Sequence, residues 1–149
     1  MRPVAIDQKF TTKCSRRRNL NAMKIVICGS RRFHDEIRKA AQKLRDDGHI
    51  VLEPILNRNE AINNLPADLR RYAFLGLTHH QLDLIRKADI CLIFNKDGYV
   101  GNSTTIELGY AVACGLPIYA LEEDKEEPGR DVLFDFVIGT IDEFIRNLP

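Results

Sequence analysis

No segment of this sequence is long and apolar enough to cross a membrane. The apolar runs, of which residues 90–94 are typical, fall far short of the roughly 20 residues of a membrane-spanning helix. The first residues lack the apolar core of a secretory signal, and no GxGxxG fingerprint is present. We therefore expect no membrane partner, and the sequence does not support a dinucleotide cofactor.

The four cysteines show neither CxxC spacing nor histidines at the spacing of metal ligands. Cys28, Cys91 and Cys114 stand in apolar segments, where cysteine acts as a small hydrophobic residue. This usage favours a reducing cytoplasm over an oxidising compartment. We expect no metal site.

Positive charge is concentrated at the N-terminus. Residues 1–22 hold six Lys or Arg and one Asp, although the whole chain of 149 residues carries a formal net charge of only +1. A basic arm can bind nucleic acid, but the remainder is acidic, so we expect no nucleic-acid partner. We interpret residues 1–22 as a disordered extension, or as residues upstream of a chain that starts at Met23. Residues 23–149 contain no repeat or linker and are expected to form one domain.

Strand and helix patterns alternate along residues 23–149. Their spacing and stop signals predict strands at 24–28, 49–52, 90–94, 117–121 and 134–138, and helices at 34–47, 69–87, 104–114 and 141–147. The second helix could be interrupted near Gly76, residues 57–66 are expected to form a loop at the active-site end, and residues 122–127 a solvated acidic loop. The order predicts an α/β fold: a doubly wound, flavodoxin- or Rossmann-like parallel sheet of about five strands with helices on both faces.

The turn after the first strand is the first candidate site. It reads Gly29-Ser30-Arg31-Arg32. Backbone N–H groups at such a turn, a helix start and two arginines favour a phosphate or carboxylate. The alternative is a simple turn with solvated arginines.

A helical carboxylate is the second candidate. Asp83 lies one turn from both His79 and His80. No further ligand spacing supports a metal, and taken alone such an aspartate is typically a surface charge.

The third candidate is Glu107, which follows a turn rich in glycine and hydroxyl groups after the strand at 90–94. That order is how an open α/β sheet builds a ligand crevice. The alternative is structural, because Thr104-x-x-Glu107 also fits a capping box.

Together these segments resemble the nucleoside 2-deoxyribosyltransferase superfamily, which includes the 2′-deoxynucleoside 5′-monophosphate N-glycosidases. The resemblance covers nearly all of residues 23–149. Asp83 and Glu107 stand 24 residues apart, a separation similar to that of the family's two acidic active-site residues. The motifs that carry it are Cys28-Gly29-Ser30-x-Arg32, Asp83-Leu84 with Ala88-Asp89, and Glu107-x-Gly109-x-Ala111 followed by Gly115-x-Pro117.

The resemblance implies that Glu107 is a nucleophile that attacks the anomeric carbon of a sugar and displaces the base. Asp83, with a raised pKa, would donate a proton to the leaving nitrogen. The residues implied to hold the substrate are Gly29, Ser30, Arg31 and Arg32 on one side and Gly101, Asn102, Ser103 and Thr104 on the other. Gly101 occupies a place where several deoxyribosyltransferases carry an aspartate, whereas Ser103 is typical of the hydrolases that use a phosphorylated substrate.

The expected function is therefore cleavage of the N-glycosidic bond of a (deoxy)nucleoside 5′-monophosphate through a covalent glycosyl-glutamate. The alternatives are base exchange between deoxynucleosides, and a nucleotide-sensing module without catalysis on the same fold. The expected partner is a small-molecule nucleoside or nucleotide. The resemblance also implies no cofactor, and a homodimer or larger homo-oligomer.

Overall fold

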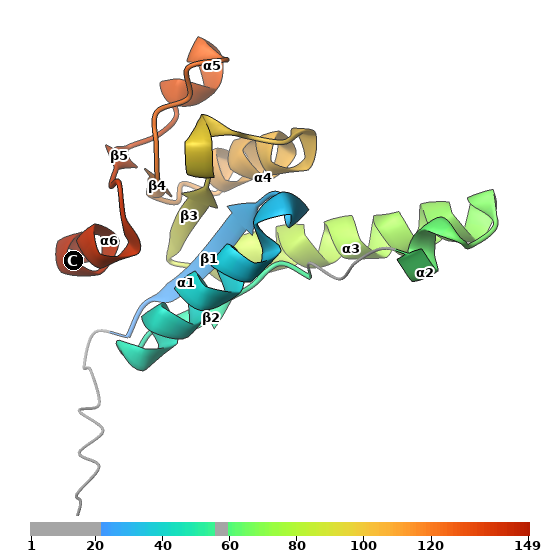
Figure 1. The fold of residues 1–149 in the computed structure, drawn as a ribbon, viewed down its shortest axis with the longest axis horizontal. Helices are drawn as coiled ribbons and strands as arrows, with labels where there is room; N and C mark the ends of the chain where they lie inside the picture. Colours follow the sequence, from blue (N-terminus) through green and yellow to red (C-terminus); the bar gives the residue numbers. More distant parts are fainter. Residues whose placement is uncertain (1–21, 56–59) are drawn as a thin grey trace, which may run out of the picture.

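The computed structural model describes residues 22–55 and 60–149, except for the side chain of residue 60 (Figure 1). The basic segment of residues 1–22 lies outside this range apart from Ala22. The interpretation of that segment, and the domain boundary at residue 23, therefore stay predictions. None of the described helices combines the length and apolar character that crossing a membrane requires.

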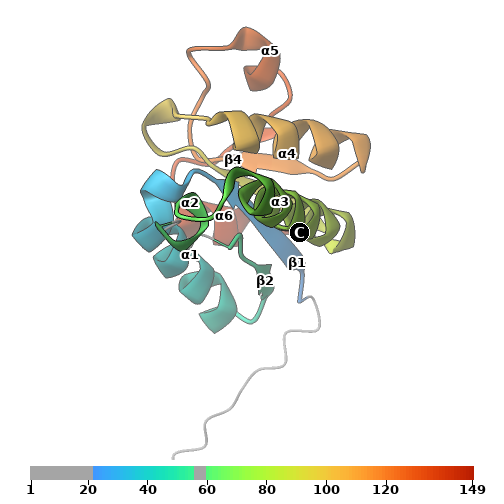
Figure 2. The same ribbon diagram turned by 90° about the vertical axis from the view of Figure 1, so that its right-hand side faces the viewer.

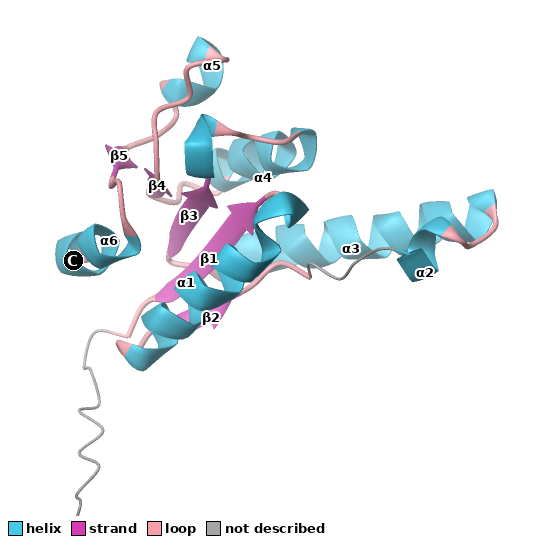
Figure 3. Ribbon diagram, viewed as in Figure 1, coloured by secondary structure: helices cyan, strands magenta, loops and turns pink. Residues whose placement is uncertain are grey.

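The centre of the fold is a five-stranded parallel sheet of order β2-β1-β3-β4-β5 (Figure 3). This is the flavodoxin-like strand order, and it confirms the predicted fold class. All five residues of β3 are buried, as expected for a parallel strand covered on both faces. The strands are β1 (Lys24–Gly29), β2 (Ile50–Leu52), β3 (Ile90–Phe94), β4 (Ile118–Ala120) and β5 (Phe136–Val137).

Helices cover both faces of the sheet (Figure 2). Alternate residues of β1, β2, β3 and β4 pack on the two faces. Ile25 and Ile27 of β1 pack with α1 (His34–Asp46) and α6 (Ile141–Asn147). Val26 and Cys28 pack on the other face with α3 (Ala67–Lys87) and α4 (Asn102–Ala113). The side chains of the sheet thus form two separate hydrophobic layers.

The chain forms α1 because its apolar residues recur at helical spacing. Its buried side chains are Ile37, Ala40, Ala41 and Leu44. Acidic residues in the first turn and basic residues in the last turn complement the helix dipole. The helix ends before Gly48, whose φ of 99° is readily adopted only by glycine.

Three local expectations from the sequence are wrong. Part of the predicted loop over 57–66 is the short helix α2 (Glu60–Asn63), while residues 57–59 lie outside the described range. Helix α3 continues through Gly76 without a break. The acidic segment 122–127 is not uniformly solvated, because the Asp124 side chain is 0% exposed and forms an ion pair with Arg130 of the short helix α5 (Pro128–Asp131).

Helix α3 is the longest element, and its N-terminal half projects beyond the sheet alongside α2 (Figure 1). Its buried side chains are Gln81 and Ile85 in the C-terminal half, where the helix lies against β1 and α4. The strand order reverses between β1 and β3. At such a reversal a crevice opens beyond the carboxyl ends of the strands, and doubly wound folds bind their ligands in this crevice.

Candidate functional site

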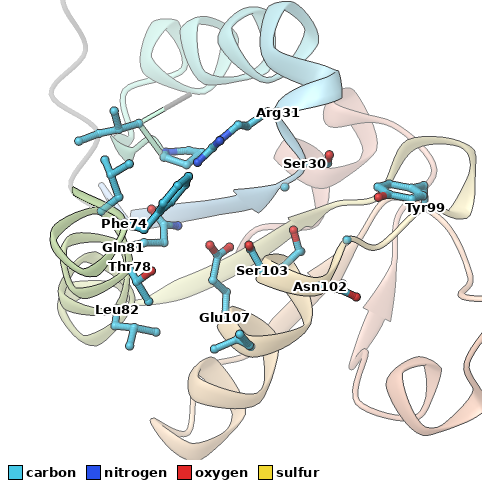
Figure 4. Close-up of a pocket in the computed structure, with 17 residues that line it drawn as sticks. Ser30, Arg31, Phe74, Thr78, Gln81, Leu82, Tyr99, Asn102, Ser103 and Glu107 are labelled. Atoms are coloured by element: carbon cyan, nitrogen blue, oxygen red, sulfur yellow. The ribbon is translucent and has the colours of Figure 1, made fainter. Parts of the chain in front are cut away.

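A pocket of about 370 Å³ lies at the carboxyl ends of β1 and β3 (Figure 4). Its walls come from the turn after β1, the segment after β2, helix α3 and the start of α4. The lining residues are Gly29, Ser30, Arg31, Pro54, Ile55, Phe74, Leu77, Thr78, Gln81, Leu82, Tyr99, Gly101, Asn102, Ser103, Thr104, Ile106 and Glu107. The pocket brings together most of the residues that the sequence selected from segments far apart in the chain.

Glu107 projects from α4 into this pocket (Figure 4). The helix has Gly101 as its N-cap, so Thr104 already lies inside the first turn and Glu107 in the second. A capping box would need the glutamate three residues after the N-cap. The capping interpretation is therefore wrong.

Burial raises the pKa of Glu107 from its ordinary 4.5 to about 7, and a hydrogen bond with Cys28 partly opposes this shift. Its Oε2 atom is buried and has no hydrogen-bond partner among the described residues. A positive charge that enters the pocket would stabilise the ionised form of this carboxylate. Near neutral pH both its protonated and its ionised form are populated.

The turn after β1 contributes to the site with one arginine. Ser30 and Arg31 line the pocket, and the Arg31 guanidinium lies 5.7 Å from the centre of the Phe74 ring. Arg32 does not line the pocket: its guanidinium stacks 3.4 Å from the centre of the Tyr99 ring. Ser30 and Arg31 thus lie in the pocket wall, whereas Arg32 contacts the wall residue Tyr99, and direct substrate contact stays a prediction.

The start of α4 supplies the opposite wall. Gly101, Asn102, Ser103 and Thr104 all line the pocket, as the sequence indicated. No described side chain caps this helix start. Its first N–H groups and the helix dipole therefore favour an anion at this wall.

Asp83 is not in the pocket. Its carboxylate forms ion pairs with Lys87 and with Arg86, the latter at 2.6 Å, and its side chain remains 36% exposed. Hydrogen bonds from Lys87 and then Arg86 lower its pKa. The expectation of a raised pKa for a proton donor at this position is wrong, because Asp83 points to solvent from the side of α3 where basic residues follow one turn later.

Gln81 stands in the pocket wall instead, and the sequence reasoning missed it. It is only 5% exposed, and its Nε2 donates to the backbone oxygen of Ile27 at 3.2 Å. The available signal was helical spacing, since Gln81 lies four residues before the buried Ile85. A polar residue on the buried face of a helix is more informative than a carboxylate on its solvated face.

Two histidines, His79 and His80, lie close to Gln81 in α3. His79 and His80 are exposed. Within the described ranges, no group of three His, Cys, Asp or Glu side chains could hold a metal ion.

Solved structures share this fold. A 2-deoxyribosyltransferase from Bacillus psychrosaccharolyticus superposes with a TM-score of 0.62 at 22% identity, over 85% of this chain and 92% of that one. A conserved protein from Enterococcus faecalis V583 superposes with a TM-score of 0.59 at 15% identity, over 85% of this chain and 96% of that one. A CMP N-glycosidase from Clostridium botulinum superposes with a TM-score of 0.48 at 18% identity, over 83% of this chain and 95% of that one. No protein-family model and no curated protein matches the sequence. The first of these structures confirms, at the level of the fold, the resemblance seen in the sequence.

Proposed function

We propose that this chain is an enzyme that cleaves the N-glycosidic bond of a (deoxy)nucleoside 5′-monophosphate with Glu107 as nucleophile. The observation that carries the proposal is the Glu107 carboxyl group, held in the wall of a ligand-sized pocket with an unpaired Oε2. The fold shared with a 2-deoxyribosyltransferase supports the same class of chemistry.

The reaction uses the negative charge of Glu107 in two ways. The ionised carboxylate stabilises the positive charge that develops on the sugar as the bond to the base lengthens, and then bonds to C1′. The electron pair of the broken C1′–N bond leaves with the base, whose nitrogen takes a proton from solvent or a neighbouring group. Water then hydrolyses the glycosyl ester, which frees the sugar and the carboxylate.

The polar end of the pocket fits a phosphorylated sugar. Ser30 comes from one side and Ser103 at the start of α4 from the other, so a phosphate there would meet two hydroxyls and helix N–H groups, while the Arg31 guanidinium lies toward Phe74. The apolar part of the wall, which includes Phe74 and Leu82, fits the base.

The first test is a screen of nucleosides and nucleotides for released free base, with wild-type protein and with Glu107→Gln. We expect release by the wild type and a loss of at least 1,000-fold in the variant, because removing a catalytic nucleophile typically costs that much. Rapid acid quenching followed by intact-protein mass spectrometry should show a sugar adduct on the wild type. Full activity of Glu107→Gln would refute the proposal.

Base exchange is distinguished in the same assay by adding a foreign base. A new nucleoside indicates transfer, whereas free sugar phosphate indicates hydrolysis. The predicted homo-oligomer is tested separately by light scattering of the purified protein.

A nucleotide-binding module without catalysis is the second candidate. The observation that favours it is Gln81, because an amide in the wall cannot protonate a leaving base as a carboxylic acid would. This alternative predicts nucleotide binding of similar affinity in wild type and Glu107→Gln, with no base released by either protein.

A further inference from the structure

The amide of Gln81 is held in one orientation beneath the pocket. Its Nε2 donates to the backbone oxygen of Ile27 at 3.2 Å and approaches the Cys28 sulfur at 3.6 Å. Rotating the amide by 180° would place its oxygen against the Ile27 oxygen, and two acceptors repel one another. The carbonyl of β1 therefore fixes which end of the amide carries the oxygen.

Both hydrogens of this amide are already used. An NH₂ group has two, and the Ile27 oxygen and the Cys28 sulfur account for them. The Oε1 atom is buried and has no hydrogen-bond partner among the described residues. Gln81 thus has an acceptor left to offer and no donor.

An unpaired buried acceptor destabilises a fold, and native proteins contain few of them. A leucine or methionine at position 81 would fill the same space against Ile85 without that cost. The wall position of Gln81 supplies a reason to keep the amide, since a ligand N–H can satisfy the oxygen.

The surroundings of Gln81 fit a base, because the Phe74 ring and the Arg31 guanidinium 5.7 Å from its centre can both stack on a planar ring. Phe74 and Leu82 of the same helix lie beside it, whereas Ser30 and Asn102 lie on the other side of Glu107 in the view of Figure 4. A sugar placed over Glu107 with its phosphate toward Ser30 would direct its base toward Gln81.

We propose that Gln81 selects the base by accepting a hydrogen bond from its amino group, so that the pocket prefers adenine or cytosine over the keto bases hypoxanthine or uracil. This assignment rests on the proposed function of the pocket. A keto oxygen in place of the amino group would face the Oε1 atom with a second acceptor. Gln81 is then a specificity-determining residue, and Glu107 alone performs the attack.

The test compares substrates that differ by one exchange of an amino group for oxygen. Release of base is measured from AMP and IMP and from CMP and UMP, as ribo- and deoxyribonucleotides. We expect the wild-type kcat/KM to favour the amino member of at least one pair by on the order of 10- to 100-fold, the range of one buried hydrogen bond with its unpaired alternative. Equal rates, or a preference for the keto member, overturn the assignment.

The matching change in the protein is Gln81→Met, which keeps the length of the side chain and removes its hydrogen-bonding groups. The preference should fall to within about 3-fold of unity, with the loss mainly on the amino substrate. Gln42→Met makes the same exchange on the exposed face of α1, where Gln42 contacts Asp46, and should retain the preference. A preference that survives in Gln81→Met overturns the assignment.

Two further measurements keep the outcome decisive. If Gln81→Met does not fold, the wild type is tested with a third substrate, purine riboside 5′-monophosphate, which has neither the amino group nor the keto oxygen. The kcat/KM values should then be highest for the adenine nucleotide and lowest for the hypoxanthine nucleotide. Any other order overturns the assignment. If no nucleotide is cleaved, the proposed function fails, but affinities of AMP and IMP measured by calorimetry still test the base preference. Equal affinities would then overturn it.

Discussion

Replacing Glu107 by glutamine should make the protein more stable at neutral and alkaline pH while removing its activity. The side chains have nearly the same size, but glutamine never ionises. In the native protein burial raises the pKa of Glu107 from 4.5 to about 7, so ionising it in the folded state is costly. At about 1.4 kcal/mol for each tenfold change in proton affinity, this shift corresponds to roughly 3 kcal/mol.

The sign follows from proton binding. Between pH 4.5 and 7 the folded protein holds the Glu107 proton and the unfolded chain has released it, so the free energy of unfolding falls as pH rises. Below pH 4.5 the two forms differ little, and above pH 7 the full cost is present. Urea denaturation of wild type and Glu107→Gln across pH 4–8.5 measures this effect. The difference in the free energy of unfolding, variant minus wild type, should rise by up to about 3 kcal/mol from its value at pH 4.5.

Asp83→Asn is the comparison with the opposite sign. Ion pairs with Lys87 and Arg86 lower the pKa of Asp83, so its contribution to stability is present above the unfolded pKa and is lost as pH falls through the lower folded one. Asp83→Asn should therefore be less stable than the wild type at neutral pH, and this difference should disappear as the pH falls. If the Glu107→Gln difference stayed constant from pH 4.5 to 8, Glu107 would be ionising in contact with water, and the pocket environment derived for it would be wrong.

Three further outcomes test other parts of the site and its support. Arg31→Ala should lower kcat/KM by on the order of 10- to 100-fold, whereas Arg32→Ala should change it by less than about 5-fold, since Arg31 lines the pocket and Arg32 does not. Gly29→Ala should cost about 1–3 kcal/mol in urea denaturation, because its new methyl group would lie 2.8 Å from Ile37 Cδ1. Arg130→Met should cost about 3–5 kcal/mol in calorimetry, because it leaves a buried carboxylate without its partner.

Much of the fold could be predicted because its strands and α1 follow simple periodicities. The run at 90–94 is buried throughout, and the apolar residues of α1 keep one face. Asp124 shows where such reasoning ends. Its neighbours in sequence are charged and exposed, and its burial is stabilised by Arg130 and by the backbone N–H groups of Glu126 and Glu127, which come together only in the fold.

The two carboxylates chosen from the sequence had different outcomes for a physical reason. Glu107 lies in the second turn of α4, the helix that begins after the buried strand β3, and the start of this helix faces the crevice of the doubly wound sheet. Asp83 lies in a long helix, where a change of two positions rotates a side chain by about 200°. Spacing along the chain could not decide whether position 81 or position 83 faces the pocket; contact of α3 with β1 decides it.

The sequence predicted the acid Asp83 in the pocket, but the wall holds the amide of Gln81 instead. The steps of the proposed reaction must therefore be divided differently between the side chains. A glycosidase with two carboxylates gives one the attack and the other the leaving group. In the proposed reaction, the pKa of Glu107 near 7 leaves enough carboxylate for attack at neutral pH, and the amide of Gln81 could orient a base but could not protonate it. A base that leaves readily should then react much faster than one that needs protonation. Among bases that carry the same amino group, which Gln81 would bind alike, the dependence of kcat on the acidity of the departing base should accordingly be steep, and a flat dependence would require a proton donor from outside the described pocket residues.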